Sequence, residues 1–220
     1  MRIIANFRKG EEARFISHLD IQRLMQRAMR RAQIPLKYSQ GFNPHPLLAF
    51  ASALSVGFTS DAEWMDVKLT APVLPEQFVS DLNAALPEGL RILRAKEIEE
   101  GQKPLTALMQ QADYAITLYP ESNVSEEACI RAIEALMGGE IVVMKRTKGG
   151  MKNVDIRPHL LDIRLVRMGE RELVFDVEGI LNAAGGLQIP LLMQAYMERL
   201  GINGRIDVHR TNVKFDLIEV

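Results

Sequence analysis

The chain has 220 residues, of which 47% are hydrophobic and 25% are charged, and its formal net charge is −1. This composition indicates a globular protein with one large or two small domains, and it argues against intrinsic disorder. The sequence has no apolar run approaching 18 residues and no charged-then-apolar leader. We therefore expect neither a membrane-spanning helix nor a classical signal peptide, and the cytoplasm is the expected compartment. The single cysteine, Cys129, excludes a disulfide framework and a cysteine-ligated cluster within this chain.

The small net charge hides a strong segregation of charge along the chain. Residues 1–50 carry nine Lys or Arg and three Asp or Glu, whereas residues 51–140 carry six and fifteen. Residues 141–172 are basic again, with eight Lys or Arg and four Asp or Glu. Two basic segments separated by an acidic one would form a single electropositive face if the fold brings them together.

The first half of the chain shows the pattern strand, helix, two strands, helix, strand. Residues 2–7 alternate weakly as a strand, and apolar residues at 21, 24, 25, 28 and 32 predict a helix over residues 17–33. Strands are predicted over residues 47–54 and 63–70, a second helix over 75–86 and a last strand over 90–98. This order predicts a ferredoxin-like (βαββαβ) domain.

The second half repeats this architecture after residues 99–112, which lack periodicity. Strands are predicted over residues 113–119 and 140–146, a hairpin over 161–167 and 172–177, and a closing strand over 205–215. Helices are predicted over residues 125–137 and 190–200. We therefore predict an α+β fold of two tandem ferredoxin-like domains, residues 1–104 and residues 105–220.

The first helix carries a basic face made of four arginines, Arg23, Arg27, Arg30 and Arg31. Like charges three or four residues apart on a helix repel each other by a few tenths of a kcal/mol per pair, and Asp20 is the only nearby acidic residue. A polyanion would offset this repulsion, so the arginines are candidate phosphate contacts. The alternative is an ordinary solvated face that finds acidic partners in the segment 51–140.

The helix start offers a candidate base. Ser17 with Asp20 has the Ser-x-x-acid form of a capping box, so the role of Asp20 can be purely structural. At a helix N-terminus the dipole disfavours the imidazolium, which would keep His18 neutral and able to accept a proton. A metal site of His18, Asp20 and His45 has no supporting ligand spacing, and none is predicted.

The segment Tyr38-Ser39-Gln40-Gly41-Phe42-Asn43-Pro44-His45-Pro46 is a second candidate site. Two prolines restrict its backbone, so a rigid loop can present Tyr38, Asn43 and His45 to a ligand. In the alternative interpretation the segment is a structural corner whose Phe42 fills the core.

The second basic segment contains Lys145, Arg146, Lys148 and Lys152 around Gly149-Gly150, followed by Val154-Asp155-Ile156-Arg157-Pro158. Such a loop can bring ammonium groups and backbone amides to phosphates, but it lacks the spacing of a nucleotide-binding P-loop. We therefore expect RNA or another polyanion rather than ATP, with Arg157 as a further contact.

Several of these segments together resemble a known family. They are Phe15-Ile16-Ser17-His18-Leu19-Asp20, the segment from Tyr38 to Pro46, Leu54-Ser55-Val56-Gly57 with Ser60 and Glu63, and Lys148 with Val154-Asp155-Ile156-Arg157-Pro158. Over essentially the whole chain they resemble the bacterial radical SAM-linked proteins, a family of unknown function encoded beside or fused to a radical SAM protein. The resemblance implies a separate radical SAM enzyme that supplies the iron–sulfur cluster and S-adenosylmethionine, with no cofactor in this chain. By association it also implies an RNA or ribosome-related substrate.

A more distant similarity concerns architecture. Paired ferredoxin-like domains with a histidine near the first helix resemble the CRISPR repeat-processing endoribonucleases, although the glycine-rich loop of that family has only a poor counterpart at residues 200–204. The resulting prediction is a non-catalytic accessory protein that binds RNA of the tRNA or rRNA type for a radical SAM enzyme. The alternatives are a metal-independent endoribonuclease that uses His18 as base, and a protein-interaction scaffold for the radical SAM partner.

Overall fold

The computed structural model describes residues 1–147 and 149–216. Contacts within the chain divide it into two compact units. The first unit comprises residues 1–109 and, after a long excursion of the chain, the segment that begins at Arg210; the second comprises residues 110–209. The last strand, β11 (Gly204–Phe215), contributes to both.

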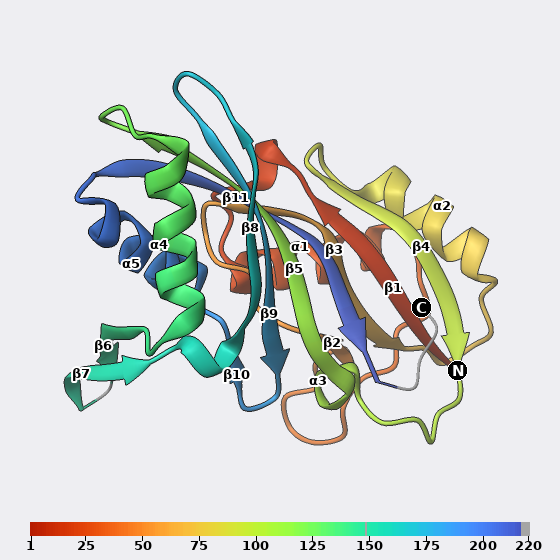
Figure 1. Ribbon diagram of the computed structural model, residues 1–220. Coiled ribbons are helices and arrows are strands. Elements are labelled where there is room, and N and C mark those ends of the chain that lie inside the picture. Colours follow the sequence, from red (N-terminus) through yellow and green to blue (C-terminus); the bar gives the residue numbers. More distant parts are fainter. Residues whose placement is uncertain (148, 217–220) are drawn as a thin grey trace. The chain divides into compact units, whose positions relative to one another are not determined.

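The first unit contains two main helices and four strands of its own (Figure 1). In chain order its elements are β1 (Arg2–Lys9), η1 (Glu11–Ala13), α1 (His18–Arg31), β2 (Leu48–Phe50), β3 (Phe58–Lys68), α2 (Pro75–Ala85), β4 (Leu90–Ile98) and α3 (Leu105–Leu108). The strand order is β4-β1-β3-β2, and each neighbouring pair is antiparallel. Both helices therefore connect strands that have another strand between them.

Alternation along the strands gives the sheet of the first unit two different faces. Ile3, Ala5 and Phe7 of β1 lie in the same apolar core as Met25 of α1 and Phe78 of α2, so one face packs on the helices. The alternate residues of β1 include Arg2 and Asn6, which are also buried. Buried polar groups require hydrogen-bond partners, so the second face, which also buries Ile4, combines polar and apolar contacts.

The second unit has the same succession of elements with an insertion. Its elements are β5 (Met109–Pro120), α4 (Glu126–Gly138), β6 (Val142–Thr147), β7 (Gly150–Asp155), η2 (Arg157–His159), β8 (Leu160–Met168), β9 (Leu173–Asn182), β10 (Gly185–Gly186), α5 (Ile189–Leu200) and the first half of β11. β9 pairs antiparallel with both β5 and β8. β10 pairs with the end of β9.

The strand predicted at residues 140–146 has a different role from the one expected. It is β6, and it pairs only with β7 in a separate two-stranded sheet (Figure 1). The sequence predicts a glycine-containing basic loop after this strand, and the structure has a second strand, β7, there. Gly149 lies in a turn, and Gly150 is the first residue of β7 with a φ of +106°, a value that favours glycine.

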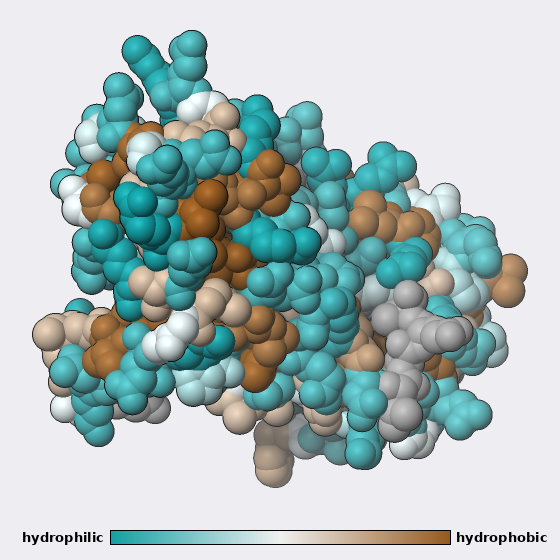
Figure 2. Space-filling view, in the orientation of Figure 1, coloured by the Kyte–Doolittle hydropathy of each residue, from teal (hydrophilic) through white to brown (hydrophobic). Residues whose placement is uncertain are grey.

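The remaining predicted elements are found within a few residues of their expected bounds, and the α+β class is confirmed. The largest differences are in strands: β3 begins at Phe58 rather than at residue 63, and β2 spans three residues rather than eight. Hydrophobic residues gather over α4 on the face shown in Figure 2. Among the residues that the structure describes, no helix combines the length and apolar character needed to cross a lipid bilayer.

Candidate functional site

The exposed face of α1 carries the four arginines predicted from the sequence. Arg23 pairs with Asp20, with 3.0 Å between the guanidinium and carboxylate atoms, and Arg27 donates to the Arg23 carbonyl at 3.3 Å. Arg31 donates to the carbonyl of Ala85 at the end of α2. Within residues 1–147 and 149–216, no carboxylate forms an ion pair with Arg27, Arg30 or Arg31. The acidic segment therefore does not neutralise this face.

The start of α1 is fixed by the predicted cap. The Ser17 hydroxyl accepts from the Asp20 amide at 3.2 Å and donates to the Asp20 carboxylate at 2.7 Å. The hydrogen bond from the Ser17 hydroxyl lowers the pKa of the Asp20 carboxylate, and the contacts with Arg23 lower it by a smaller amount. Asp20 thus stabilises the helix start and orients one arginine.

His18, the candidate base, is half buried at the first position of α1. Its ring meets the ring of Phe50 edge-on, with the centroids 5.3 Å apart. His18 also lines a cavity with Lys9 and Glu63. The volume of this cavity is about 10 Å³, enough for one water molecule.

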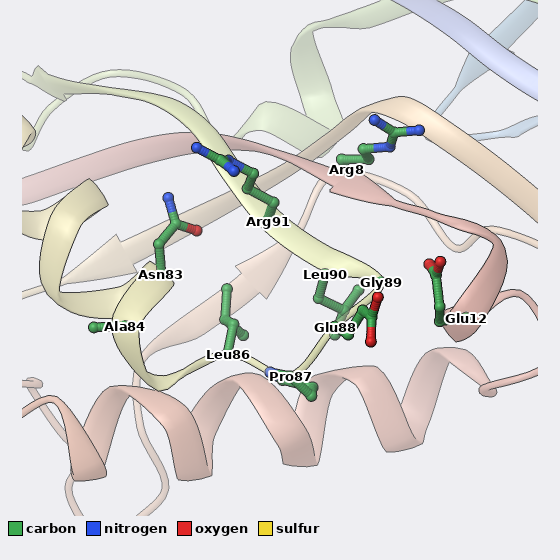
Figure 3. A pocket seen from close by; sticks show the side chains of 10 residues that line it. All are labelled: Arg8, Glu12, Asn83, Ala84, Leu86, Pro87, Glu88, Gly89, Leu90 and Arg91. Carbon is green, nitrogen blue, oxygen red and sulfur yellow. The ribbon is translucent and has the colours of Figure 1, made fainter.

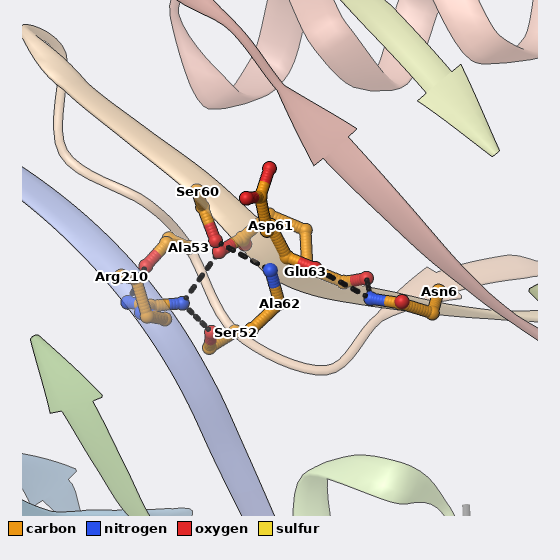
Figure 4. Close-up of polar contacts among 8 residues, drawn as sticks. All are labelled: Asn6, Ser52, Ala53, Ser60, Asp61, Ala62, Glu63 and Arg210. Carbon is orange, nitrogen blue, oxygen red and sulfur yellow. Dashed lines mark hydrogen bonds and ion pairs between the residues drawn. The ribbon is translucent and has the colours of Figure 1, made fainter. Parts of the chain in front are cut away.

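Lys9 and Glu63 belong to a buried polar cluster beneath the start of α1. The Lys9 ammonium donates to the Arg14 carbonyl at 3.0 Å. Burial lowers the pKa of Lys9, and the nearby Glu63 carboxylate partly opposes this effect. Arg210, which follows in the chain almost 150 residues after Glu63, pairs with that carboxylate at 3.0 Å and donates to Ser52 at 2.8 Å (Figure 4).

Arg14, the residue before the first segment of the family resemblance, contacts Gly57 of the third segment beside this cluster. The Arg14 guanidinium donates to the Gly57 carbonyl at 2.7 Å, and the Gly57 amide donates to the Arg14 carbonyl at 3.0 Å. Gly57 has a φ of +88°, which explains the glycine at this position. The segment before α1 is therefore held in place by contacts of buried or half-buried residues, namely Arg14, Gly57 and Glu63.

The loop over residues 38–46 is a closed, exposed structure. Ser39 and His45 hold its ends together through a backbone hydrogen bond of 2.9 Å and two contacts of the Ser39 hydroxyl with His45. Asn43 is exposed, Tyr38 is 40% exposed, and Phe42 at the tip is fully exposed. The interpretation in which Phe42 fills the core is therefore wrong, because a core position would bury the ring.

The basic residues of the second unit divide into two environments. Lys145 and Lys152 lie directly opposite each other in the β6–β7 hairpin, and Arg146 faces Met151. Across the described chain, none of these three side chains forms an ion pair with a carboxylate. Lys148 lies outside the described residues.

Arg157 has a different environment from the hairpin cations. Its guanidinium donates to the Met137 carbonyl in the last turn of α4 at 3.1 Å and to the Leu160 carbonyl at 2.8 Å. The neighbouring Asp155 carboxylate accepts from the Ile141 and Arg157 amides. These contacts give Arg157 and Asp155 a structural role at the base of the hairpin, and a phosphate contact by Arg157 stays a prediction.

Two pockets in the first unit were not foreseen from the sequence. One, of about 660 Å³, is open and is lined by Arg8, Glu12, Glu88, Arg91 and residues of the α2–β4 connection (Figure 3). The other, of about 310 Å³, is lined by His45, the two buried ionic side chains Arg2 and Asp66, and nearby loop residues. A charged residue among apolar strand positions, as Arg2 and Asp66 are, is the sequence signal that could have located the second pocket.

In the described part of the chain, no group of three His, Cys, Asp or Glu side chains lies close enough together to hold a metal ion. Cys129 is buried. In the first unit, α1 exposes cations and the 38–46 loop exposes aromatic rings; in the second unit, the β6–β7 hairpin exposes cations.

Solved structures show a similar fold. A chain in the crystal structure of a Cbf5-Nop10-Gar1 complex matches with a TM-score of 0.59 and 13% identity, over 99% of this chain and 50% of that one. A chain in the structure of an H/ACA RNP bound to a substrate RNA containing 2′-deoxyuridine matches with a TM-score of 0.56 and 12% identity, over 95% and 46%. A third match, in an archaeal box H/ACA sRNP Nop10-Cbf5 complex, has a TM-score of 0.51 and 11% identity, over 94% and 46%. The chain thus spans about half the length of each of these proteins, and at this identity the likeness concerns the fold alone.

A search of the curated proteins found no match. A family model described as "Uncharacterized protein conserved in bacteria" matches residues 2–188. Because this match covers most of the chain, the protein belongs to that bacterial family of unknown function, DUF2344, as the resemblance in its sequence predicts.

Proposed function

We propose that this protein binds RNA, without catalysing a reaction itself, and that α1 supplies the main phosphate contacts. The observation that carries the proposal is the set of exposed α1 arginines, of which Arg27, Arg30 and Arg31 form no ion pair with a carboxylate of the described chain. Like charges in neighbouring turns repel each other, and a row of phosphates would replace that repulsion with attraction. Guanidinium groups are also suited to bidentate contacts with phosphate oxygens.

The 38–46 loop would supply contacts to bases or sugars. A fully exposed aromatic ring is not buried in the folded protein, so it adds no hydrophobic stabilisation to the fold. In RNA-binding proteins such rings stack on unpaired bases, and each stacked base contributes about 1–3 kcal/mol. Phe42, Tyr38, Asn43 and His45 fit this role, and Lys145, Arg146, Lys148 and Lys152 would add phosphate contacts in the second unit.

The fold supports the proposal. Both units share the order of elements of a split βαβ arrangement. We infer that each is ferredoxin-like, with the β6–β7 hairpin inserted in the second. The predicted domain boundary between residues 104 and 105 is part of this proposal. Two of the similar chains come from an H/ACA RNP bound to a substrate RNA and from an archaeal box H/ACA sRNP complex. Fold similarity supports RNA binding only as an expectation for this chain.

The accessory role concerns a separate radical SAM enzyme. The family resemblance in the sequence implies such a partner, which would hold the iron–sulfur cluster and S-adenosylmethionine. One buried cysteine cannot ligate that cluster, so this chain would position the RNA for a modification carried out by the partner.

The test is RNA binding measured by fluorescence anisotropy, with labelled tRNA and rRNA fragments over a range of salt concentrations. We expect the affinity of the wild type to fall steeply with salt. The double variant Arg27→Glu/Arg30→Glu should bind at least tenfold more weakly and lower the slope of log K against log salt by about 1.5 to 2, since two phosphate contacts are lost.

The matched control is Arg27→Lys/Arg30→Lys, which keeps both charges and should keep most of the salt slope. Both double variants should unfold within about 0.5 kcal/mol of the wild type, because the residues are exposed. RNA binding that is absent, or insensitive to salt, contradicts the proposal and favours a protein scaffold. RNA cleaved in EDTA to 2′,3′-cyclic phosphate ends, and left intact by His18→Ala, would instead establish the nuclease alternative.

A further inference from the structure

The pocket of about 310 Å³ lies on the sheet face that does not pack on the main helices. Ala49 pairs with Asp66 in the β2–β3 register, and Arg2 pairs with Lys68 in the β1–β3 register. Paired residues point to the same face. The opposite face holds the apolar core with α1 and α2. The pocket is therefore built on a part of the sheet whose buried side chains are charged.

A buried ion pair forms the polar floor of this pocket. The Arg2 Nε donates to both carboxylate oxygens of Asp66, at 2.9 and 3.1 Å, and the remaining guanidinium nitrogens reach the carbonyls of Gln102 and Lys103. The hydrogen bond with Asp66 raises the pKa of Arg2. Both side chains are nearly excluded from solvent, at 4% and 11% exposure. The carboxylate is thus held in one orientation.

Asp66 retains capacity for one more hydrogen bond. A carboxylate offers about four acceptor positions, and among the described residues the partners of Asp66 all belong to Arg2. One position on Oδ1 is therefore left at the pocket. A ligand that donates an N–H to it would gain a charge-assisted hydrogen bond with a largely buried carboxylate.

The other lining residues restrict the ligand further. Pro46, Leu47 and Pro104 give apolar walls. Three titratable side chains line the pocket as well: His45, Lys68 and Glu100, whose carboxylate pairs with the N-terminal ammonium at 2.9 Å. A volume of about 310 Å³ lies at the lower end of the roughly 300–1,000 Å³ of small-molecule sites, which suits one nucleoside and is too small for a dinucleotide. We propose that this pocket binds a single nucleobase, with Asp66 accepting from its N–H edge and Lys68 near the attached phosphate.

The base can come from two sources, an unstacked nucleotide of the bound RNA or a free nucleotide. The first source rests on the RNA-binding function proposed above, and it would connect the 38–46 loop, through His45, to the recognition of one base. The second is independent of that function. Both share the same chemistry, a flat heterocycle with an N–H donor and a nearby phosphate.

The test is a substitution that fills the pocket and leaves the Arg2–Asp66 ion pair unchanged. Ala49 is exposed and adjoins Asp66, so Ala49→Phe should occupy the space, and phenylalanine is well tolerated in strands. The matched control Ala84→Phe makes the same change at the other pocket (Figure 3). Fluorescence of the single tryptophan, Trp64, which is buried in the first unit, checks that each variant folds. The smaller Ala49→Leu replaces Ala49→Phe if the latter unfolds.

Two measurements decide the proposal and its source. With RNA, Ala49→Phe should weaken binding about tenfold while the salt slope stays that of the wild type, and Ala84→Phe should bind normally. In NMR titrations with AMP, GMP, CMP and UMP, a free-nucleotide site would shift amide signals of residues 45–49 and 66–68 in the wild type but not in Ala49→Phe. Either effect supports the pocket and identifies the source; the absence of both overturns it. If the wild type binds no RNA, the RNA-binding proposal fails separately, and the nucleotide titration alone supports or overturns the pocket.

Discussion

Two groups of arginines in the first unit have opposite environments. Arg2 and Arg210 lie in strands, are almost fully buried and each pair with a buried carboxylate. Arg23, Arg27, Arg30 and Arg31 lie on α1 and are exposed, and only Arg23 forms an ion pair within the described chain. The first group holds the sheet together, whereas the second group is available to a ligand. Net charge along the sequence counts both groups alike.

The difference follows from solvation. A charge removed from water requires a partner and hydrogen bonds, because an unpaired buried ion is strongly unfavourable. An exposed arginine keeps its water shell, so its contribution to stability is small. The following three predictions test this division of the basic residues, from the largest expected effect to the smallest.

The largest effect is expected at the buried ion pair between Arg210 and Glu63. Arg210→Met leaves the Glu63 carboxylate buried without its partner, so the free energy of unfolding of the first unit should fall by about 3–5 kcal/mol. Urea unfolding followed by Trp64 fluorescence measures this loss. Arg210→Met/Glu63→Met removes both charges and should recover a large part of it. A single variant as stable as the wild type would contradict a structural role for Arg210.

Arg157 tests the division in the second unit. Its hydrogen bonds to the Met137 and Leu160 carbonyls predict that Arg157→Met lowers the stability of that unit by about 1–3 kcal/mol and leaves RNA affinity nearly unchanged. Thermal unfolding by circular dichroism and the anisotropy titration measure the two quantities. If the variant is stable but binds RNA weakly, Arg157 contacts phosphate instead.

The smallest effect is expected in the β6–β7 hairpin. Because Lys145 and Lys152 are directly opposite, Lys152→Glu turns a repulsive pair into an attractive one and should stabilise the hairpin by about 0.2–1 kcal/mol. Amide hydrogen exchange of β6 and β7 reports this change. The same variant should weaken RNA binding a few-fold, since it removes a cation and adds a carboxylate. Lys152→Gln, which removes only the charge, should fall between the two in both measurements.

The sequence predicted local features well. The Ser17 cap, the apolar face of α1 and the bounds of the helices depend on residues within one or two turns of each other, and the structure has them as expected. The strand β7 was not predicted, because a short, exposed strand without regular alternation of apolar and polar residues gives no local signal. Phe42 was misjudged in one interpretation because an aromatic residue usually indicates a core position.

Composition, periodicity and local motifs therefore determined the α+β class, the element order, the α1 arginines and the family resemblance. Only the tertiary structure decided which charges are paired, because Arg2 meets Asp66 and Glu63 meets Arg210 across separations of 64 and 147 residues. The same holds for the pocket beside His45, whose lining residues come from four separate segments of the first unit. Contacts between distant segments depend on strand register and burial, and neither quantity is written in the local pattern of residues.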